Sequence, residues 1–194
     1  DEIFSQVDIP NFVNTKIDYK LNKISGEQVK LAQSTNISDL ESYNNLDELE
    51  NNISDCQKCA LGSTRTKFVY GVGNPNADLM LIGEAPGAEE DKKGIPFVGR
   101  AGKLLTDILK AINFERDEVY IANILKCRPP NNRDPLPSER ELCSPYLIKQ
   151  IELIKPKIIL CLGKVASNVM LNKNETLTRL RSEVHDFNGI KLMV

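Results

Sequence analysis

The stretch Asp78-Leu79-Met80-Leu81-Ile82-Gly83-Glu84-Ala85-Pro86-Gly87 decides the fold of this 194-residue chain. Its first part, residues 78–83, is a short apolar run that ends in glycine, which is typical of a strand buried in a parallel sheet. Its second part, residues 84–87, is a turn rich in glycine and proline that opens on an acidic residue. Because ligands of open α/β sheets bind beyond the carboxyl ends of the strands, this turn is a candidate functional site.

Three further apolar runs predict strands on the C-terminal side of this stretch, at Val119–Leu125, Lys157–Gly163 and Ile190–Val194. Helical patterns lie between them. Strands and helices that alternate in this way form a parallel sheet with helices on both faces. We therefore predict an α/β fold, a three-layer α/β/α sandwich with a central four-stranded parallel sheet.

The helices between these strands are predicted from periodicity and end signals. A capping-box pattern at Ser138 and Glu141 opens one helix, which Pro145 should kink or interrupt. Another is predicted at Lys164–Leu171. In the first helix, Ala101–Asn113, the apolar residues are expected on one face, and they are Leu104, Leu105, Ile108 and Ile112.

The composition divides the chain into an acidic N-terminal part and a basic body. Residues 1–55 carry eleven acidic and four basic side chains, a balance of −7, whereas residues 56–194 carry sixteen and twenty-one, a balance of +5. We read residues 1–54 as an acidic, mostly disordered tail with a short helix near Ile37–Leu49, and residues 55–194 as the folded domain, incomplete at its C-terminus. A basic body suits a nucleic-acid partner, although a balance of this size is also ordinary.

The sequence shows no targeting or membrane signal. No apolar run approaches the roughly 20 residues that span a bilayer, and the first residues lack a basic patch followed by an apolar stretch. Nothing in the cysteine usage points to an oxidising compartment. We therefore expect a cytoplasmic protein.

Four of the five cysteines can form one metal site. Cys56 and Cys59 are separated by two residues, so that both sulfurs can face one centre, and Cys127 and Cys143 flank a proline-rich loop that can complete a four-thiolate cage. Cys161 lies inside an apolar strand and is expected to be a buried hydrophobe. Four thiolates suit either zinc or a cubane iron–sulfur cluster, and their spacing leaves both open.

Residues near two strand ends can bind a planar ligand. The turn after Gly83 can present backbone N–H groups to an anion or a carbonyl, and Glu84 is a candidate acid, base or water anchor, or else part of an ordinary turn. Phe97 lies between glycines and prolines and can stack on a base or serve as core. Asn123 can read a base edge or bond to the backbone. His185, the only histidine, is not expected to be catalytic.

Taken together, these features resemble the family 4 uracil-DNA glycosylases from about Cys56 to the end of the chain. Each motif is weak alone, and their order makes the resemblance specific. The motifs are Cys56-x-x-Cys59, Gly83-Glu84-Ala85-Pro86-Gly87, Pro96-Phe97-Val98-Gly99, Asn123 with Lys126-Cys127-Arg128-Pro129-Pro130, and Cys143.

The resemblance implies a DNA-repair hydrolase that flips uracil out of single- or double-stranded DNA and cleaves its N-glycosidic bond without a lyase step. It implies a structural 4Fe–4S cluster, so that iron is favoured over zinc, and a monomer. Phe97 would stack on the uracil, Asn123 would pair with its carbonyl and imide edge, and Glu84 with the Gly83–Ala85 backbone would line the pocket and hold the attacking water. The cluster ligands would be Cys56, Cys59, Cys127 and Cys143.

The chain departs from the family's pattern at its end. Family members continue past the fourth strand into a His-Pro motif whose histidine polarises the uracil carbonyl, and this chain ends at Val194, before that segment. His185 matches a different position. The alternative function is therefore a non-catalytic nucleic-acid-binding domain with a structural iron–sulfur or zinc site, since similar domains occur in polymerase-associated proteins.

Overall fold

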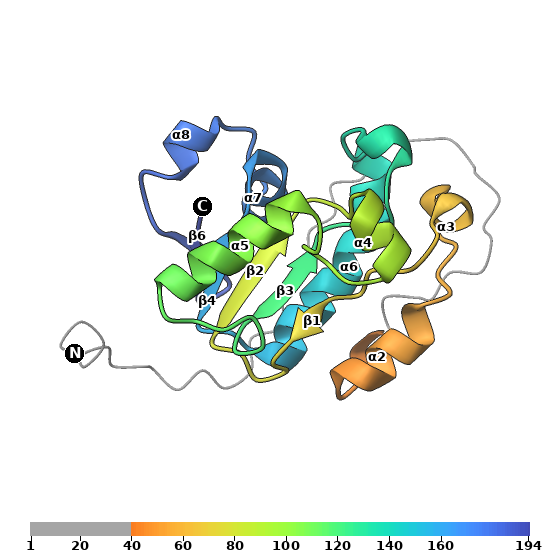
Figure 1. The fold of residues 1–194 in the computed structure, drawn as a ribbon, viewed down its shortest axis with the longest axis horizontal. Helices are drawn as coiled ribbons and strands as arrows, with labels where there is room; N and C mark the ends of the chain where they lie inside the picture. Colours follow the sequence, from red (N-terminus) through yellow and green to blue (C-terminus); the bar gives the residue numbers. More distant parts are fainter. Residues whose placement is uncertain (1–39) are drawn as a thin grey trace. The chain divides into compact units, whose positions relative to one another are not determined.

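A six-stranded sheet with the order β1-β3-β2-β4-β6-β5 organises the domain (Figure 1). In the computed structural model, residues 40–194 are described. The strands are β1 (Val72–Gly73), β2 (Leu79–Gly83), β3 (Tyr120–Asn123), β4 (Ile158–Cys161), β5 (His185–Phe187) and β6 (Ile190–Met193).

The four central strands, β3, β2, β4 and β6, run parallel to one another. They coincide with the four predicted strands, so the predicted parallel sheet is confirmed. The sequence did not predict the two edge strands, which pair antiparallel: β1 with β3, and β5 with β6. Both are short, and β1 has only two residues, so neither shows a period that a pattern search can detect.

Helices pack on both faces of the sheet, so the predicted three-layer α/β/α arrangement is confirmed. The helices are α2 (Leu46–Ile53), α3 (Leu61–Thr64), α4 (Ala88–Lys93), α5 (Arg100–Ala111), α6 (Pro137–Ile154), α7 (Lys164–Leu171) and α8 (Leu177–Leu180), with a 3-10 turn, η1 (Pro130–Asn132). Across residues 40–194, none of these helices has both the length and the apolar character that a bilayer crossing requires.

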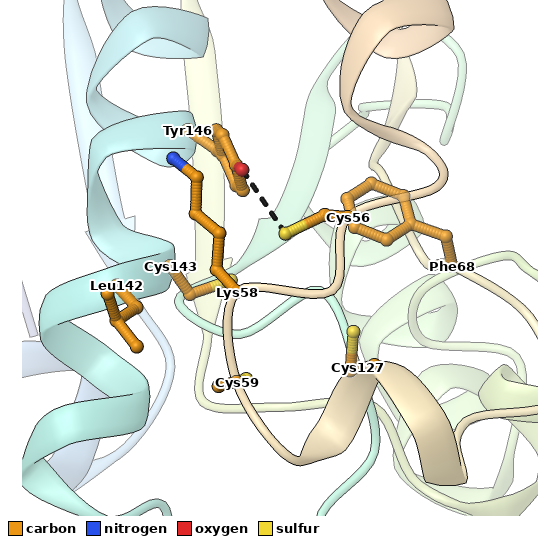
Figure 2. A pocket seen from close by; sticks show the side chains of 9 residues that line it. Cys56, Lys58, Cys59, Phe68, Cys127, Leu142, Cys143 and Tyr146 are labelled. Atoms are coloured by element: carbon orange, nitrogen blue, oxygen red, sulfur yellow. Dashed lines mark hydrogen bonds between the residues drawn. The ribbon is translucent and has the colours of Figure 1, made fainter. Parts of the chain in front are cut away.

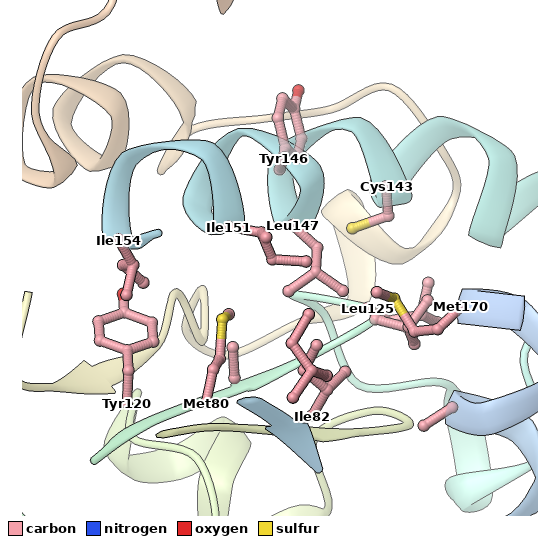
Figure 3. Packing of buried hydrophobic residues seen from close by; sticks show 14 of the residues in the cluster. Met80, Ile82, Tyr120, Leu125, Cys143, Tyr146, Leu147, Ile151, Ile154 and Met170 are labelled. Carbon is pink, nitrogen blue, oxygen red and sulfur yellow. The ribbon is translucent and has the colours of Figure 1, made fainter. Parts of the chain in front are cut away.

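The strand β2 is buried on both faces because its side chains alternate between two hydrophobic clusters. Met80 and Ile82 belong to the larger cluster, beneath α6 (Figure 3). Leu81 belongs to the smaller cluster with Leu105 and Leu109 of α5. Each fully buried aliphatic side chain contributes about 1.5–3 kcal/mol. This two-sided burial explains the continuous apolar run that the sequence shows.

The helix α6 differs in two ways from the prediction. It is continuous from Pro137 to Ile154 and includes Pro145, which was expected to kink or interrupt it. The capping residue is Glu139 rather than Glu141, because its Oε2 accepts a hydrogen bond from the backbone N–H of Leu136 at 2.9 Å. The first turn therefore begins two residues earlier than the capping-box pattern indicated, with Leu136 rather than Ser138 at the N-cap position.

The apolar face predicted for the first helix was partly wrong. Leu105 is 5% exposed and packs on the sheet together with Leu109, but Leu104 is 60% exposed, and Ile108 and Ile112 are exposed as well. The helix has two apolar stripes, and the sequence pattern merges them. The buried stripe is the one that includes Gly102, where the helix approaches the preceding turn.

Residues 40–54, assigned to the tail from sequence, include α2. Asn45 caps this helix, since its Oδ1 accepts from the backbone N–H of Glu48 at 2.9 Å. Leu49 and Ile53 of α2 are buried in the larger cluster. The disordered tail was predicted for residues 1–54 and the short helix near Ile37–Leu49. For residues 1–39, which lie outside the described part of the chain, both stay predictions.

The two stripes of α5 predict that alanine substitutions at neighbouring leucines will differ in their effect on the free energy of unfolding. Leu105→Ala should lower the free energy of unfolding by about 2–5 kcal/mol, because it leaves a cavity in the smaller cluster. Leu104→Ala should change it by no more than about 0.5 kcal/mol, because that side chain is in solvent. Urea denaturation of both variants measures the difference, and equal losses would contradict the assignment of the stripes.

Candidate functional site

Two of the predicted site residues lie side by side at the carboxyl end of the sheet. Gly83 ends β2, Asn123 ends β3, and the two are paired in the parallel register. The pairing continues past the strand ends, because the backbone N–H groups of Ile124 and Leu125 donate to the carbonyls of Gly83 and Glu84 at 2.9 and 3.0 Å. The register thus holds both loops that leave this edge.

Phe97 joins these residues from the loop before α5. A Cβ atom built on Gly83 would come within 2.6 Å of Phe97 Cζ and even closer to Asn123 Oδ1. The phenyl ring and the carboxamide therefore meet over a position that has no side chain. Only glycine fits at position 83. Because glycine has no side chain, the aromatic ring of Phe97 and the amide of Asn123 can both approach the backbone there.

The carboxamide of Asn123 is buried and incompletely paired. The residue is 2% exposed, and its Oδ1 accepts no hydrogen bond. Within residues 40–194, only one other buried side-chain nitrogen or oxygen atom, Arg116 Nη1, lacks a partner. A buried carbonyl oxygen without a donor costs about 1–3 kcal/mol. An amide in this state suits a ligand that supplies the missing donor.

Glu84 lies next to this group in the turn after β2, and it is partly buried. Burial raises the pKa of its carboxyl group above the usual value, the nearby Asp134 raises it further, and Arg140 acts in the opposite direction. Ala85 packs against the larger hydrophobic cluster. Gly83 contacts Phe97 and Asn123, and Glu84 and Ala85 directly follow Gly83 in the chain, so all three predicted residues lie near the Phe97–Asn123 pair.

Two residues of the acidic run after this turn, Glu90 and Asp91, accept hydrogen bonds from the backbone of neighbouring loops instead of facing solvent. Glu90 Oε1 accepts from the backbone N–H groups of Val98 and Gly99 at 3.0 and 2.9 Å. Asp91, which is 5% exposed, accepts from the N–H of Thr66 at 2.8 Å. Sequence reasoning gave neither residue a function, because a run of acidic side chains at a helix start usually is solvated.

The four predicted ligand cysteines line a single pocket (Figure 2). Cys56 and Cys59 come from the turn between α2 and α3, Cys127 from the segment after β3, and Cys143 from α6. All of the cysteines are free thiols. The expectation that these four meet is supported by their shared pocket. The rest of its wall is formed by Lys58, Gly62, Phe68, Leu142 and Tyr146.

Hydrogen-bond donors point at three of the sulfurs. The backbone N–H of Lys126 donates to Cys143 Sγ at 3.3 Å, Arg65 Nη1 donates to Cys127 Sγ at 3.5 Å, and the hydroxyl of Tyr146 donates to Cys56 Sγ at 3.2 Å (Figure 2). Donors to sulfur favour the thiolate form over the thiol. The arrangement suits four cysteines that act as ligands.

Without a ligand, burial favours the neutral thiols. It raises the pKa of Cys127 to about 11 and that of Cys143 to about 12. The four thiols share a pocket, but across residues 40–194 no three His, Cys, Asp or Glu side chains have the arrangement of a formed metal site. Cys161 lies elsewhere, buried in β4 and in the larger hydrophobic cluster, as its apolar neighbours in sequence predict.

A buried lysine joins the two groups of residues. Lys126 is fully buried, and its Nζ donates to the carbonyl of Asn123 at 3.0 Å and to Gln150 Oε1 at 2.6 Å. Gln150 in turn donates to the hydroxyl of Tyr120 at 3.2 Å. Burial lowers the pKa of Lys126 to about 8. Sequence reasoning gave Lys126 no role of its own, since a lysine after a strand is usually exposed.

His185 has structural partners. It is 9% exposed in β5, and its Nε2 lies 2.8 Å from the carbonyl oxygen of Leu180. Its Nδ1 faces Lys173 and Glu183 at 3.5 and 3.6 Å. None of these bonds reaches the Gly83 turn, and the expectation that His185 is not catalytic stays a prediction.

Comparison with known proteins identifies the family. The profile of the uracil DNA glycosylase superfamily matches residues 70–192. The Type-4 uracil-DNA glycosylase of Archaeoglobus fulgidus is 49% identical over 145 residues, which are 73% of this chain and 73% of that protein. The Type-4 uracil-DNA glycosylase of Thermotoga maritima is 43% identical over 143 residues, 73% of this chain and 74% of that protein.

A more distant similarity lies in a larger protein. The DNA polymerase of Bacillus phage SP01 is 33% identical over 126 residues, which are 64% of this chain but 14% of the polymerase. The two Type-4 proteins, by contrast, are matched over most of their own length. On these matches, the chain belongs to the Type-4 family within the uracil DNA glycosylase superfamily.

Proposed function

We propose that this protein removes uracil from DNA by hydrolysing the N-glycosidic bond, which leaves an abasic site. The observation that carries the proposal is the space over Gly83, where the Phe97 ring and the unpaired Asn123 carboxamide meet. A ring and an amide are the two groups that a planar, hydrogen-bonding base requires. The family relatives named as uracil-DNA glycosylases support the same reaction.

In this proposal Asn123 reads the edge of the extruded base. Its Oδ1 accepts from the imide N–H of uracil, and its Nδ2 donates to the adjacent carbonyl. Cytosine presents the opposite polarity at both positions, so it would leave buried groups mismatched at a cost of about 1–3 kcal/mol each. Phe97 stacks on the face of the base, which adds affinity with little selectivity.

The reaction develops negative charge on the uracil and positive charge on the sugar. Stabilisation is therefore mainly electrostatic, through N–H donors aimed at the uracil oxygen where charge develops. The Asn123 amide is one such donor. Glu84 is proposed to hold and polarise the attacking water, for which it must be a carboxylate. Because burial and Asp134 raise its pKa, this form is lost at a higher pH than for an ordinary glutamate.

We further propose a 4Fe–4S cluster on Cys56, Cys59, Cys127 and Cys143. Four thiols on one pocket, with N–H and O–H donors to three of the sulfurs, fit such a group. When bound, the cluster would supply structural cross-linking rather than redox chemistry. It would replace the protons that burial keeps on Cys127 and Cys143.

Protein purified without oxygen should therefore be brown and contain about four irons per chain, the stoichiometry of a cubane. Cys127→Ser and Cys143→Ser should lose the absorption of the cluster because each removes a ligand. Cys161→Ser is the matched control and should keep it, since that thiol lies outside the pocket. Stoichiometric zinc in protein prepared anaerobically would overturn the cluster assignment.

The full-length protein should release free uracil from single-stranded DNA and from U·G pairs, and the product strand should stay intact until alkali is added. Binding should weaken with salt because contacts to phosphates release counterions. A strand nicked without alkali would show a different reaction. Salt-dependent DNA binding with no uracil release would favour the second candidate, a non-catalytic nucleic-acid-binding domain, for which the similarity to a phage DNA polymerase speaks.

Variants at the two residues over Gly83 should separate recognition from stacking. Asn123→Asp should reduce uracil excision strongly, since a carboxylate cannot donate to the uracil carbonyl and repels the developing anion. Phe97→Ala should reduce the rate but preserve the preference for uracil over cytosine. Single-turnover excision of both bases measures this difference. Near wild-type rate and selectivity in Asn123→Ala would mean that another group reads the base.

A further inference from the structure

The turn before α5 that contains Phe97 has a backbone conformation that a phenylalanine rarely adopts. Phe97 has a φ of 53°, in the left-handed region that side chains with a Cβ rarely adopt. Its carbonyl approaches Gly102 of α5 so closely that a Cβ atom there would clash with it. Since the ring must lie over Gly83 to meet a base, the surrounding residues must hold the turn in this state.

Arg116 contacts the turn from the segment between α5 and β3. Its Nη2 donates to the carbonyl of Pro96, the residue directly before Phe97. Its Nη1 is buried and has no hydrogen-bond partner. Burying a guanidinium with one nitrogen unpaired is costly. The bond to the carbonyl of Pro96 and the attraction of the Glu90 charge both offset part of that cost.

Glu90 of α4 contacts the other end of the same turn. One oxygen, Oε1, accepts from both N–H groups that directly follow Phe97, those of Val98 and Gly99, at 3.0 and 2.9 Å. An ionised acceptor shared by two backbone donors is a strong hydrogen-bonding arrangement. The turn is therefore fixed immediately before and immediately after Phe97, by charged groups from two different elements.

We propose that Arg116 and Glu90 are positioning residues that set the pose of the Phe97 ring over Gly83. The inference rests on the proposed uracil excision for its effect on rate, but its geometry is independent of that reaction. Neither residue needs to contact the base for this role. Their loss should release the turn from its left-handed conformation, and the ring would then leave the position over Gly83.

The test is a double-mutant cycle in the full-length protein. Arg116→Ala should slow single-turnover uracil excision by about tenfold to a hundredfold, the loss that a small misplacement of a binding group causes. In a Phe97→Ala background the same change should slow excision by no more than about twofold, because residues that act through one another are not additive. Arg116→Lys keeps a donor for Pro96 and should recover most of the lost rate.

A second measurement follows the turn directly. Hydrogen exchange at the amides of Val98 and Gly99 should be faster in Arg116→Ala and Glu90→Ala than in the wild type. Glu90→Gln retains an oxygen that can accept both bonds but loses the charge, so its exchange and excision rate should lie between those of the wild type and of Glu90→Ala. Arg179→Ala, which removes an exposed arginine of α8, is the control and should alter neither.

Two outcomes would overturn the proposal. One is an additive loss, in which Arg116→Ala slows the Phe97→Ala protein as much as it slows the wild type. The other is unchanged exchange at Val98 and Gly99 in both alanine variants. If the wild-type protein releases no uracil, the proposed function fails instead, and the exchange experiment still decides whether the two residues hold the turn.

Discussion

The parallel pairing of β2 with β3 determines where the proposed site residues of this protein meet. It sets Gly83 opposite Asn123 and, through two more backbone hydrogen bonds, holds the loops that leave both strands. A slip of one residue would turn Asn123 to the opposite face of the sheet. The register is protected against such a slip because β2 is buried on both faces, in clusters that α5 and α6 supply. The core and the site thus depend on the same pairing.

The short segment from Asn123 to Cys127 connects the proposed base-binding site with the cysteine pocket. Lys126 lies between them: its ammonium group bonds to the carbonyl of Asn123, and its backbone N–H bonds to the sulfur of Cys143. The buried Gln150 on α6 accepts the second bond of the ammonium group. Assembly of the cysteine pocket therefore constrains the backbone of the residue proposed to read the base, although three of the four cysteines come from other parts of the chain.

The sequence predicted the features that repeat or that alternate in polarity. The four parallel strands and the gathering of four cysteines on one pocket follow from apolar runs, glycine exits and the order of motifs. Features that depend on single long-range contacts were not predictable. The two edge strands are too short to show a period, and Leu104 shares the spacing of the buried stripe although it faces solvent. Glu90, Asp91 and Arg116 look like ordinary surface charges until the loops that they bond to are in place.

The lack of room for a side chain at Gly83 limits which substitutions the proposed site can accept. Any side chain there would collide with the Phe97 ring and the Asn123 carboxamide, so the floor of the site cannot be varied by single substitutions. Gly102 imposes a similar limit beneath the turn, where the carbonyl of Phe97 occupies the position of a Cβ atom. If Phe97 and Asn123 contact the base as proposed, a new base preference must arise through the ring and the amide themselves. The geometry therefore leaves very few positions around these two glycines at which a substitution could alter the proposed site without displacing its backbone.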